Sequence, residues 1–548
     1  MKKYYKHIYQ IIVVTSIVIG MGLTACTDDI EGLNENPLRL TEDMLAIDYA
    51  NVGAFLPQME QSIYYNTSGE SYKFQLQQNL NADIYSGYLC PPTPFRGGKN
   101  ASNYYLVDWF NWPFKLGYEN IMGPWSEIKK LTYESSREFY GTALVLKVAG
   151  MHRVADLYGP TPYSNYGQGG QFTEYDSQKE VYEQFFLELD TATTLISDYY
   201  EEYPEAKPIA KFDLIYKGDF SKWLKWANSL RLRLAIRISN VDPVMAKAQG
   251  EKALDNKYGL LETNDEIVQV DQPLQGHPLT DMAYSWGDTR MGANMESIMV
   301  GYNDPRLSLF FAPATDDNVV ASADTYKGIR YGIDIISKDD RIGYSNIGEY
   351  FSLENTYQIP WLLMSTAEVY FLKAEAGLRG WANAGDVKEN YEAGVRLSME
   401  QWGVNSGDID DYLLDDSSKP IDYTDTNAPQ YDVAAVSDIT IKWDAGSSNE
   451  VKLERIITQK WLAMFPEGAE AWAEFRRTGY PKLLPLEVNY SGETTIGQVP
   501  DGEFIKRLPF SRDEYNSNIE GVESGVEKLG GLDNAGVRLW WDTGSNNL

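Results

Sequence analysis

The stretch "GDFSKWLKWANSLRLRLAIRIS" (218–239) predicts an amphipathic helix and thereby decides the fold class. Its apolar residues recur at spacings of three and four: Trp223, Ala227, Leu230, Leu234 and Ile238. A stripe of this kind marks one buried helical face. Asp219 stands at the expected N-cap position, and Arg233 and Arg237 lie near the C-terminal end, where the helix dipole favours cations.

Periodic segments of helical length lie on both sides of this helix. Before it, we predict helices over 42–65, 71–88, 117–134, 139–158 and 178–198. After it, we predict helices over 365–381, 386–403, 449–465 and 467–479. The pair 365–381 and 386–403 has about the length of one tetratricopeptide unit, but the residue pattern of that repeat is poorly kept. Periodicity alone therefore predicts a mainly α fold and leaves helical-hairpin repeats open.

The remaining segments lack stripes of helical length. Residues 262–360 carry short apolar runs among many Gly, Asp and Asn residues, which predicts loops and short strands. We divide the chain into a signal peptide, an acidic tether, an N-terminal helical-hairpin region, an irregular region and a C-terminal helical region. Their bounds are 1–25, 26–45, 46–261, 262–360 and 361–548, with an acidic insertion at 404–447 and a loop-rich tail from 480.

The first residues predict an export signal. Lys2, Lys3 and Lys6 form a basic head before the apolar run "IIVVTSIVIGMGL" (11–23). This run is shorter than the roughly 20 residues that a membrane-spanning helix needs. We therefore interpret residues 1–25 as a cleaved signal peptide.

The residues around Cys26 predict a lipid anchor. "LTAC" (23–26) resembles the lipobox of bacterial lipoproteins, at which the cysteine is acylated, whereas the alternative is an ordinary signal peptide with an accidental cysteine. Several acyl chains, such as palmitate, hold a protein stably at a membrane where one chain would not. The following Asp28, Asp29 and Glu31 resemble surface-export signals of Gram-negative lipoproteins, which favours the outer face of the outer membrane.

The composition excludes several classes of partner. Loss of the three lysines in residues 1–25 changes the formal net charge from −31 to −34. A chain of this charge repels nucleic acid and anionic membrane surfaces. If Cys26 is acylated, Cys90 has no disulfide partner, and only His152 and His277 remain in the mature chain. We therefore expect no disulfide, no cofactor and no His-rich metal site.

Seven stretches carry a resemblance to one known family. In chain order they are "ADLYGPTPYSNYG" (155–167), "KWLKWANSLRLRLAIRIS" (222–239), "NDPRLSLFF" (303–311), "AEVYFLKAEAGLRGW" (367–381), "QKWLAMFPEGAEAWAEFRRTGYP" (459–481), "RLPFSRDEYNSN" (507–518) and "GGLDNAGVRLWWD" (530–542). Together they resemble the SusD/RagB-like family of nutrient-binding outer-membrane lipoproteins. Phe510 stands where the family often has Tyr, and the insertion 404–447 is longer than expected.

This resemblance implies a fold and a role. The fold would be a superhelical body of four tetratricopeptide-like hairpins with an irregular, loop-rich second subdomain. The role would be to cap a TonB-dependent, SusC-like outer-membrane transporter and to present a glycan or another nutrient to it. No enzymatic activity is implied.

The alternatives are a surface glycoside hydrolase and a purely structural envelope lipoprotein. A hydrolase needs two carboxyl groups facing each other across a sugar. Glu467, Glu470 and Glu474 instead share one helical face near a helix start, where acids complement the dipole, so we assign them to structure. The acidic runs "DIDDYLLDD" (408–416) and "DYTDTN" (422–427) lack the spacing of a calcium loop, which favours solvated loops over a metal site.

Stacking of a sugar on an aromatic ring requires that ring to be exposed, which favours aromatic residues in loops. Five tryptophans lie on helix stripes and are predicted to be core: Trp223, Trp226, Trp381, Trp461 and Trp472. The candidate ligand-binding loops are "PFRGGKNASNYYLVDWFNWPF" (94–114) and "MAYSWGDTR" (282–290). Their candidate residues are Tyr104, Asp108, Trp109, Trp112, Tyr284, Trp286 and Arg290, with Asn111 and Asp288 as polar neighbours. If the fold brings both loops together, they form one platform beside the transporter.

Overall fold

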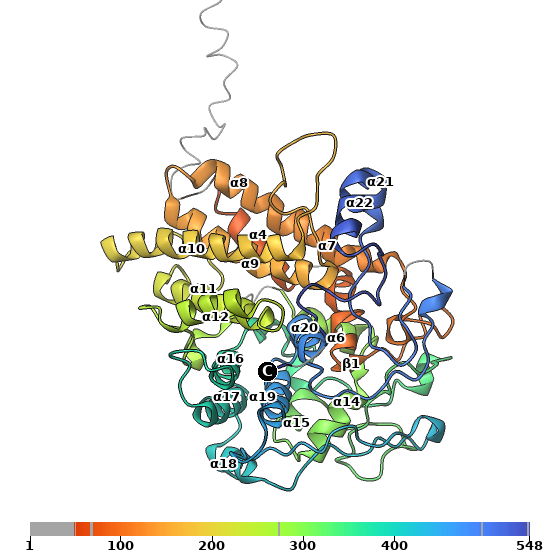
Figure 1. The fold of residues 1–548 in the computed structure, drawn as a ribbon. Coiled ribbons are helices and arrows are strands. Elements are labelled where there is room, and N and C mark those ends of the chain that lie inside the picture. The colour runs from red at the N-terminus through yellow and green to blue at the C-terminus, as the bar shows by residue number, and fades with distance from the viewer. Residues whose placement is uncertain (1–48, 50, 66–69, 272–274, 495–496, 545–546) are drawn as a thin grey trace, which may run out of the picture. The chain divides into compact units, whose positions relative to one another are not determined.

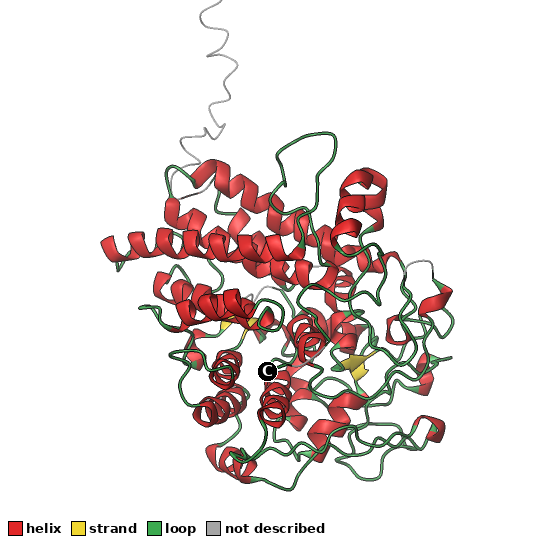
Figure 2. Ribbon diagram, viewed as in Figure 1, coloured by secondary structure: helices red, strands yellow, loops and turns green. Residues whose placement is uncertain are grey.

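The computed structural model describes residues 49, 51–65, 70–271, 275–494, 497–544 and 547–548. From Gly53 to Leu548 the chain forms one compact unit of helices joined by long loops (Figure 1, Figure 2). The predicted signal peptide, the acidic tether and Cys26 lie outside the described residues.

Helices make up most of the regular structure, so the predicted mainly α fold is confirmed. The longer helices are α4 (Phe55–Ile63), α8 (Gly123–Thr132), α9 (Arg137–Tyr158), α10 (Gln178–Glu202), α11 (Phe220–Arg237), α12 (Pro243–Leu254), α16 (Thr366–Leu378), α17 (Val387–Gln401), α18 (Ser406–Leu414), α19 (Asn449–Ala463), α20 (Gly468–Thr478) and α22 (Ile519–Lys528). The shorter ones are α5 (Ser71–Phe74), α6 (Ala82–Tyr85), α7 (Trp112–Gly117), α13 (Pro278–Thr280), α14 (Ala293–Met295), α15 (Leu307–Phe310) and α21 (Arg512–Ser517).

Single turns of other helix types continue some of these helices or lie in the loops. The π-helical turns are η2 (Gln75–Asn79), η5 (Tyr118–Met122), η7 (Asp281–Ser285) and η8 (Glu296–Val300). The 3₁₀ turns are η3 (Ala101–Asn103), η4 (Asp108–Asn111), η6 (Asn264–Glu266), η9 (Lys338–Asp340), η10 (Glu349–Phe351), η11 (Thr356–Gln358), η12 (Pro429–Tyr431) and η13 (Ser491–Glu493).

Local side chains fix where the long helices begin. The carboxylate of Asp219 accepts the backbone N–H groups of Ser221 (3.1 Å) and Lys222 (3.4 Å) at the start of α11, as predicted. At the start of α10, Ser177 and Glu180 form a reciprocal capping box. These side chains satisfy donors that the first helical turn leaves unpaired.

The helices pack as pairs that follow one another through the unit. α9 packs on α10, α11 on α12 and α16 on α17, and short loops at 238–242 and 379–386 make hairpins of the last two pairs. Because α10 also packs on α11 and α11 on α16, the pairs are stacked (Figure 1). Stacked helix pairs of this kind are typical of tetratricopeptide-like folds.

The segment between α12 and α16 is irregular and contains short helical turns and three of the four short strands found in the described residues. β2 (Val268–Val270) pairs antiparallel with β4 (Trp361–Met364). β3 (Arg290–Met291) pairs antiparallel with β1 (Leu89–Cys90), so that Cys90 lies opposite Arg290. This second pair ties the irregular segment to the loop that follows α6.

Some helices were not predicted from the sequence. α12 follows α11 directly, α18 lies inside the acidic insertion, and α21 and α22 lie in the tail. At the start of α18, the side chain of Asn405 accepts the N–H of Asp408 (3.1 Å), and Ile409 and Leu413 are buried. The many acidic residues of this helix obscured its narrow apolar stripe.

The tryptophans predicted from helix stripes to lie in the core are all buried: Trp223, Trp226, Trp381, Trp461 and Trp472. Where an indole carries its N–H into the core, a partner can satisfy it, as Asp213 does for Trp223 at 2.8 Å.

A buried ionic network crosses this core. Its members lie on α9, α11, α16, α19 and α20: Asp156, Arg233, Arg237, Glu368, Glu375, Lys460, Glu470, Glu474 and Arg477. Arg233 forms two hydrogen bonds with Glu368 (2.8 and 2.6 Å) and thereby joins α11 to α16. Buried charges require such partners, so the network fixes how these helices pack.

Candidate ligand-binding surface

Two loops that are far apart in the sequence meet beside the β1–β3 pair. The hydroxyl of Thr93, after β1, donates to Oδ1 of Asp288, just before β3, at 2.6 Å. The ammonium of Lys338 donates to the same oxygen at 2.9 Å, and the amide of Gln75 donates to the other oxygen at 3.2 Å. Asp288 therefore connects η2, the loop after β1, the loop before β3 and η9. The two candidate loops are neighbours.

Trp286 offers a ring to solvent at this junction. It lies directly after η7 and is 38% exposed. Its backbone carbonyl accepts a hydrogen bond of 2.5 Å from Lys338. The backbone is thus held in place while the indole remains available for stacking.

Trp109 lies on η4 and is half-buried. Its ring meets the ring of Phe95 edge-on, with the centroids 5.6 Å apart, and the guanidinium carbon of Arg96 lies 5.2 Å from the indole centroid. Arg96 and the neighbouring Asp108 are exposed. A ring with charged groups beside it suits a ligand that has both flat apolar faces and hydroxyl groups.

Trp112 begins α7 and is also half-buried. It meets Tyr72 edge-on at a centroid distance of 5.8 Å, and the ammonium of Lys115 lies 5.1 Å from its centroid. Tyr72 is 42% exposed and belongs to α5, which runs directly into the turn that carries Gln75. A chain of contacts therefore leads from Trp112 back to Asp288.

We name this group of rings the aromatic surface. Its members are Tyr72, Trp109, Trp112 and Trp286.

Tyr104 does not belong to this surface, although the sequence pattern favoured it. Its side chain is completely buried, and its ring packs against Tyr85 and Tyr331. Its hydroxyl accepts the backbone N–H of Ile505 at 3.0 Å. Burial raises the pKa of this phenol. Tyr104 therefore anchors the C-terminal tail. The sequence pattern could not show this burial, because the segment that covers this loop residue is distant in sequence.

Arg290 and Tyr284 are likewise engaged inside the protein. Arg290 is 6% exposed and donates to the backbone carbonyls of Ile342 (2.9 Å) and Thr289 (2.7 Å), and burial lowers its pKa to about 10. Tyr284 is half-buried and donates its hydroxyl to the carbonyl of Ile347 at 2.7 Å. Arg290 thus satisfies carbonyl groups of the irregular segment rather than facing a ligand.

The polar neighbours of the candidate rings differ in availability. Asn111 accepts the backbone N–H of Arg512 at 3.0 Å and so holds the start of α21. The carboxylate of Asp288 already accepts hydrogen bonds from Thr93, Lys338 and Gln75. The exposed polar groups beside the rings are Arg96, Asp108 and Lys115.

A small cavity behind Trp109 limits where a ligand can bind. It has a volume of about 30 Å³ and is lined by Phe95, Tyr105 and Phe110 among others. A space of this size holds about two water molecules and no sugar ring. A sugar that stacks on Trp109 would therefore have to contact the outer face of its ring.

Sequence reasoning missed Tyr72 and Arg96 as members of this region. Tyr72 lies in a segment predicted as helix, where an aromatic ring indicates core packing. Arg96 precedes two glycines, and that exposed turn was the available signal.

The carboxylates considered for hydrolysis lie in the ionic core. Glu470 accepts from Arg237 at 2.5 Å, and both Glu470 and Glu474 are almost completely buried. Glu467 pairs with Arg153 and accepts the N–H of Ala469 at the start of α20. These acids therefore contact cations and a backbone amide inside the protein.

The described part of the chain lacks two features. Its His, Cys, Asp and Glu side chains form no cluster of three that could hold a metal ion. None of its helices combines the length and apolar character needed to cross a membrane.

Comparisons with known proteins agree on one family. The SusD-like family, described as Susd and RagB outer membrane lipoprotein, matches residues 32–542. A chitin-binding SusD homolog from Flavobacterium johnsoniae is 41% identical, covers 91% of this chain and 100% of its own, and superposes with a TM-score of 0.85. Homologs from Bacteroides vulgatus and Bacteroides uniformis are each 36% identical, with TM-scores of 0.82 and 0.81. They cover 92% and 90% of this chain and 100% and 99% of their own. Comparison with curated proteins gave no match.

Proposed function

Because this chain belongs to the SusD-like family of outer-membrane lipoproteins, we propose that it binds a glycan at the cell surface and passes it to a TonB-dependent transporter. The observation that carries the proposal is the 41% identity to a chitin-binding homolog over the whole length of that homolog. The aromatic surface supports it, since Trp286 and Tyr72 are exposed rings. We propose chitin oligosaccharides as the ligand.

The chemistry of the aromatic surface suits such a ligand. Each N-acetylglucosamine unit has a flat C–H face that stacks on an indole, and its hydroxyl and acetamido groups form hydrogen bonds. Arg96 and Lys115 provide donors beside Trp109 and Trp112, and Asp108 provides an acceptor. Successive sugars would then lie on successive rings.

Calorimetric titration with chitohexaose tests this proposal. Cellohexaose is the matched control, because it has the same backbone linkage and lacks the acetamido groups. We expect saturable binding of chitohexaose and weaker binding of cellohexaose. Equal affinity for both would contradict chitin as the ligand, and absence of binding to any glycan in a wider panel would contradict the function.

We further propose that the ligand is bound without being cleaved. The acids on α20 are held by Arg153, Arg237 and Lys460, which supports a structural role for them. Mass spectrometry of chitohexaose after prolonged incubation with the protein should find the hexasaccharide intact. Shorter products would favour a glycoside hydrolase instead.

The partner and the location complete the proposal. Acylated Cys26 would hold the protein at the outer face of the outer membrane, where it would cap the transporter. Purification in mild detergent should recover a TonB-dependent transporter together with the protein. Recovery of the protein without any transporter, or its protection from protease added to whole cells, would contradict this arrangement.

A further inference from the structure

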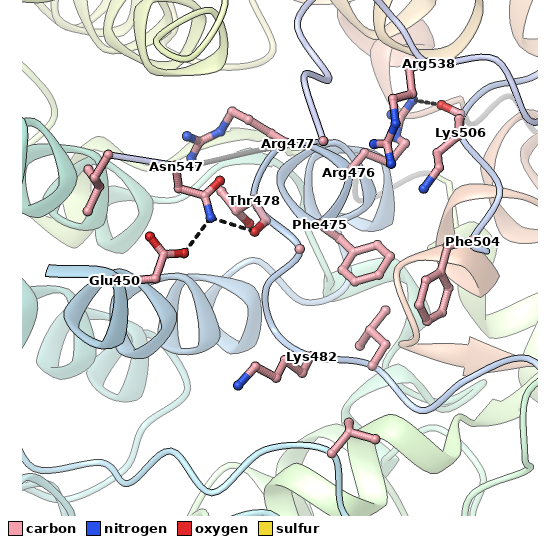
Figure 3. Close-up of a pocket in the computed structure, with 15 residues that line it drawn as sticks. Glu450, Phe475, Arg476, Arg477, Thr478, Lys482, Phe504, Lys506, Arg538 and Asn547 are labelled. Atoms are coloured by element: carbon pink, nitrogen blue, oxygen red, sulfur yellow. Dashed lines mark hydrogen bonds between the residues drawn. The ribbon is translucent and has the colours of Figure 1, made fainter. Parts of the chain in front are cut away.

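A second concavity, which the proposed function does not use, lies at the C-terminal end of α20. It has a volume of about 770 Å³ and is lined by α20, by residues 482–483 and by parts of the tail (Figure 3). Its cationic lining residues are Arg476, Arg477, Lys482, Lys506 and Arg538. A concentration of cations is unexpected in a chain whose formal net charge is −31. We refer to this concavity as the basic pocket.

Three of these cations lie together on one side of the pocket. Figure 3 shows Arg476, Lys506 and Arg538 close to one another, whereas Glu450 lies across the pocket from them. Arg538 pairs with Asp542 at 2.6 Å. The nearest carboxylate oxygen to the ammonium of Lys506 is 3.7 Å away and belongs to an exposed glutamate, Glu503. Among these three cations, Arg538 alone forms a close ion pair with a carboxylate of the described residues.

Arg476 is buried without a carboxylate partner. Its Nη1 donates to the backbone carbonyls of Asp156 (2.6 Å) and Lys506 (3.0 Å), and its guanidinium lies 3.8 Å from the ring centroid of Trp472. Within the described residues no carboxylate lies within ion-pair distance of it, and its Nη2 has no hydrogen-bond partner. Carbonyl groups and a ring face stabilise the cation, and the carboxylates of Asp156 and Asp542 act on it from beyond ion-pair distance.

The pKa directions agree with this geometry. Burial lowers the pKa of Lys506, and the charge of Arg538 lowers it further. Burial also lowers the pKa of Arg476. In both cases the protonated state is less favourable than in water, and a nearby anion would restore its stability.

The pocket also has an apolar wall. Phe475 and Phe504 line it and meet edge-on, with their ring centroids 4.9 Å apart (Figure 3). The volume lies within the range of small-molecule sites. A ligand with one negatively charged group and a flat or apolar part fits both sides of the pocket.

We propose that the basic pocket binds the oxyanion group, a carboxylate or a sulfate, of a small ligand such as an acidic sugar. Hydrogen bonds from cations to such groups are charge-assisted and therefore stronger than neutral ones. Lys506 and Arg538 would contact the oxyanion, and Arg476 would contribute its field from behind them. The pocket is lined by none of the residues of the aromatic surface, so this proposal does not depend on chitin binding.

Titration with sodium sulfate, with D-glucuronate and with D-glucose tests this proposal in the purified protein, at an ionic strength held constant with sodium chloride. We expect sulfate, glucuronate or both to bind saturably at one site, and neutral glucose not to bind. Saturation by sulfate alone identifies a sulfate-bearing ligand, and saturation by glucuronate identifies a carboxylate-bearing one. Absence of saturable binding by either anion overturns the proposal.

Variants at Lys506 locate the binding. Lys506→Gln should weaken the affinity for the anion by about tenfold or more, since a hydrogen bond to a charged group is lost. Lys506→Glu should abolish binding and raise the melting temperature, because the new carboxylate occupies the position of the anion beside Arg476 and Arg538. Lys528→Gln is the matched control, at a partly exposed lysine that pairs with Glu174, and should leave the affinity for the anion unchanged. Unchanged affinity in Lys506→Glu overturns the proposal.

Discussion

Arg477 donates two parallel hydrogen bonds of 2.7 Å to the two carboxylate oxygens of Glu375, and this pair joins α20 to α16. The same guanidinium donates to Glu474 at 2.7 Å, and Lys460 of α19 lies 3.3 Å from that carboxylate. All four side chains are 2% exposed or less. The packing of α16, α19 and α20 therefore depends on ion pairs that water cannot reach.

Removal of one partner from this network should strongly destabilise the protein. Glu375→Gln leaves Arg477 with one carboxylate partner instead of two. It also removes the carboxylate that pairs with Arg379. Loss of one partner from a buried pair costs about 3–5 kcal/mol of unfolding free energy. Urea unfolding at neutral pH measures this difference.

An exposed ion pair provides the control for that experiment. Glu127 and Lys130 lie 2.6 Å apart on α8, with side chains 45% and 63% exposed. Glu127→Gln should change the unfolding free energy by less than about 1 kcal/mol, because water and salt screen the pair. Similar losses in Glu127→Gln and Glu375→Gln would show that the buried network does not hold the fold.

A buried histidine should make stability depend on pH. Nδ1 of His277 accepts the N–H of Leu279 at 3.2 Å, and the ring lies between Tyr64 and Phe351 at centroid distances of 5.4 and 5.2 Å. Burial lowers its pKa from 6.5 to about 3. Between these values the unfolded chain binds a proton that the folded protein excludes, so the contribution of His277 is complete above pH 6.5 and lost as the pH falls towards 3.

His277→Asn isolates this effect. Asparagine keeps an acceptor at the start of α13 but does not titrate, whereas His152 is present in both proteins and cancels in the comparison. We expect the unfolding free energy of the wild type to fall more steeply than that of the variant between pH 6.5 and 4. The same slope in both proteins would contradict the buried neutral state of His277.

The long helices could be predicted because their signals are local. Asp219 caps α11 within three residues of itself, and the stripe that begins at Trp223 repeats within a few turns. α18 escaped prediction because acids such as Asp410 and Asp411 fill its outer face. Its apolar residues are too few to be recognised without the helices that cover them.

The surroundings of the site residues could not be predicted, because distant segments decide them. Ile505 is 401 positions from Tyr104, yet its N–H donates to the hydroxyl that we expected at the surface. Glu470 was assigned to structure correctly in outline, but Arg237, which pairs with it, is 233 positions away. Thr93 and Asp288 meet only because β1 pairs with β3.

Cys26 lies outside the described residues, and its predicted lipidation is open to a direct test. Cys26→Ala should release the protein from membranes, since the acyl chains would be missing. Cell fractionation followed by mass spectrometry of the N-terminus checks both the location and the acyl groups. Tight membrane association of the variant, with no acyl mass on the wild-type protein, would contradict the anchor.

Trp286→Ala should weaken binding of chitohexaose without changing stability. Loss of one stacking ring should reduce the binding free energy by about 1–3 kcal/mol, by analogy with base–aromatic stacking. The melting temperature should stay the same, because an exposed ring contributes little to the core. Trp223→Ala is the opposite control: its ring is buried, so a cavity should cost about 3–5 kcal/mol of stability.

Trp109→Ala tests whether the rings act on one ligand. If Trp109 and Trp286 stack on different sugars of the same chain, each loss should be large for chitohexaose and one of them should vanish for chitobiose, which is too short to reach both. The losses for chitohexaose should then add in the double variant, because rings without a shared contact contribute independently. Trp109 also packs on Phe95, so its variant needs a melting curve beside the titration. Full affinity in both single variants, or a fall in melting temperature without a change in affinity, would assign these tryptophans to packing and move the glycan site elsewhere.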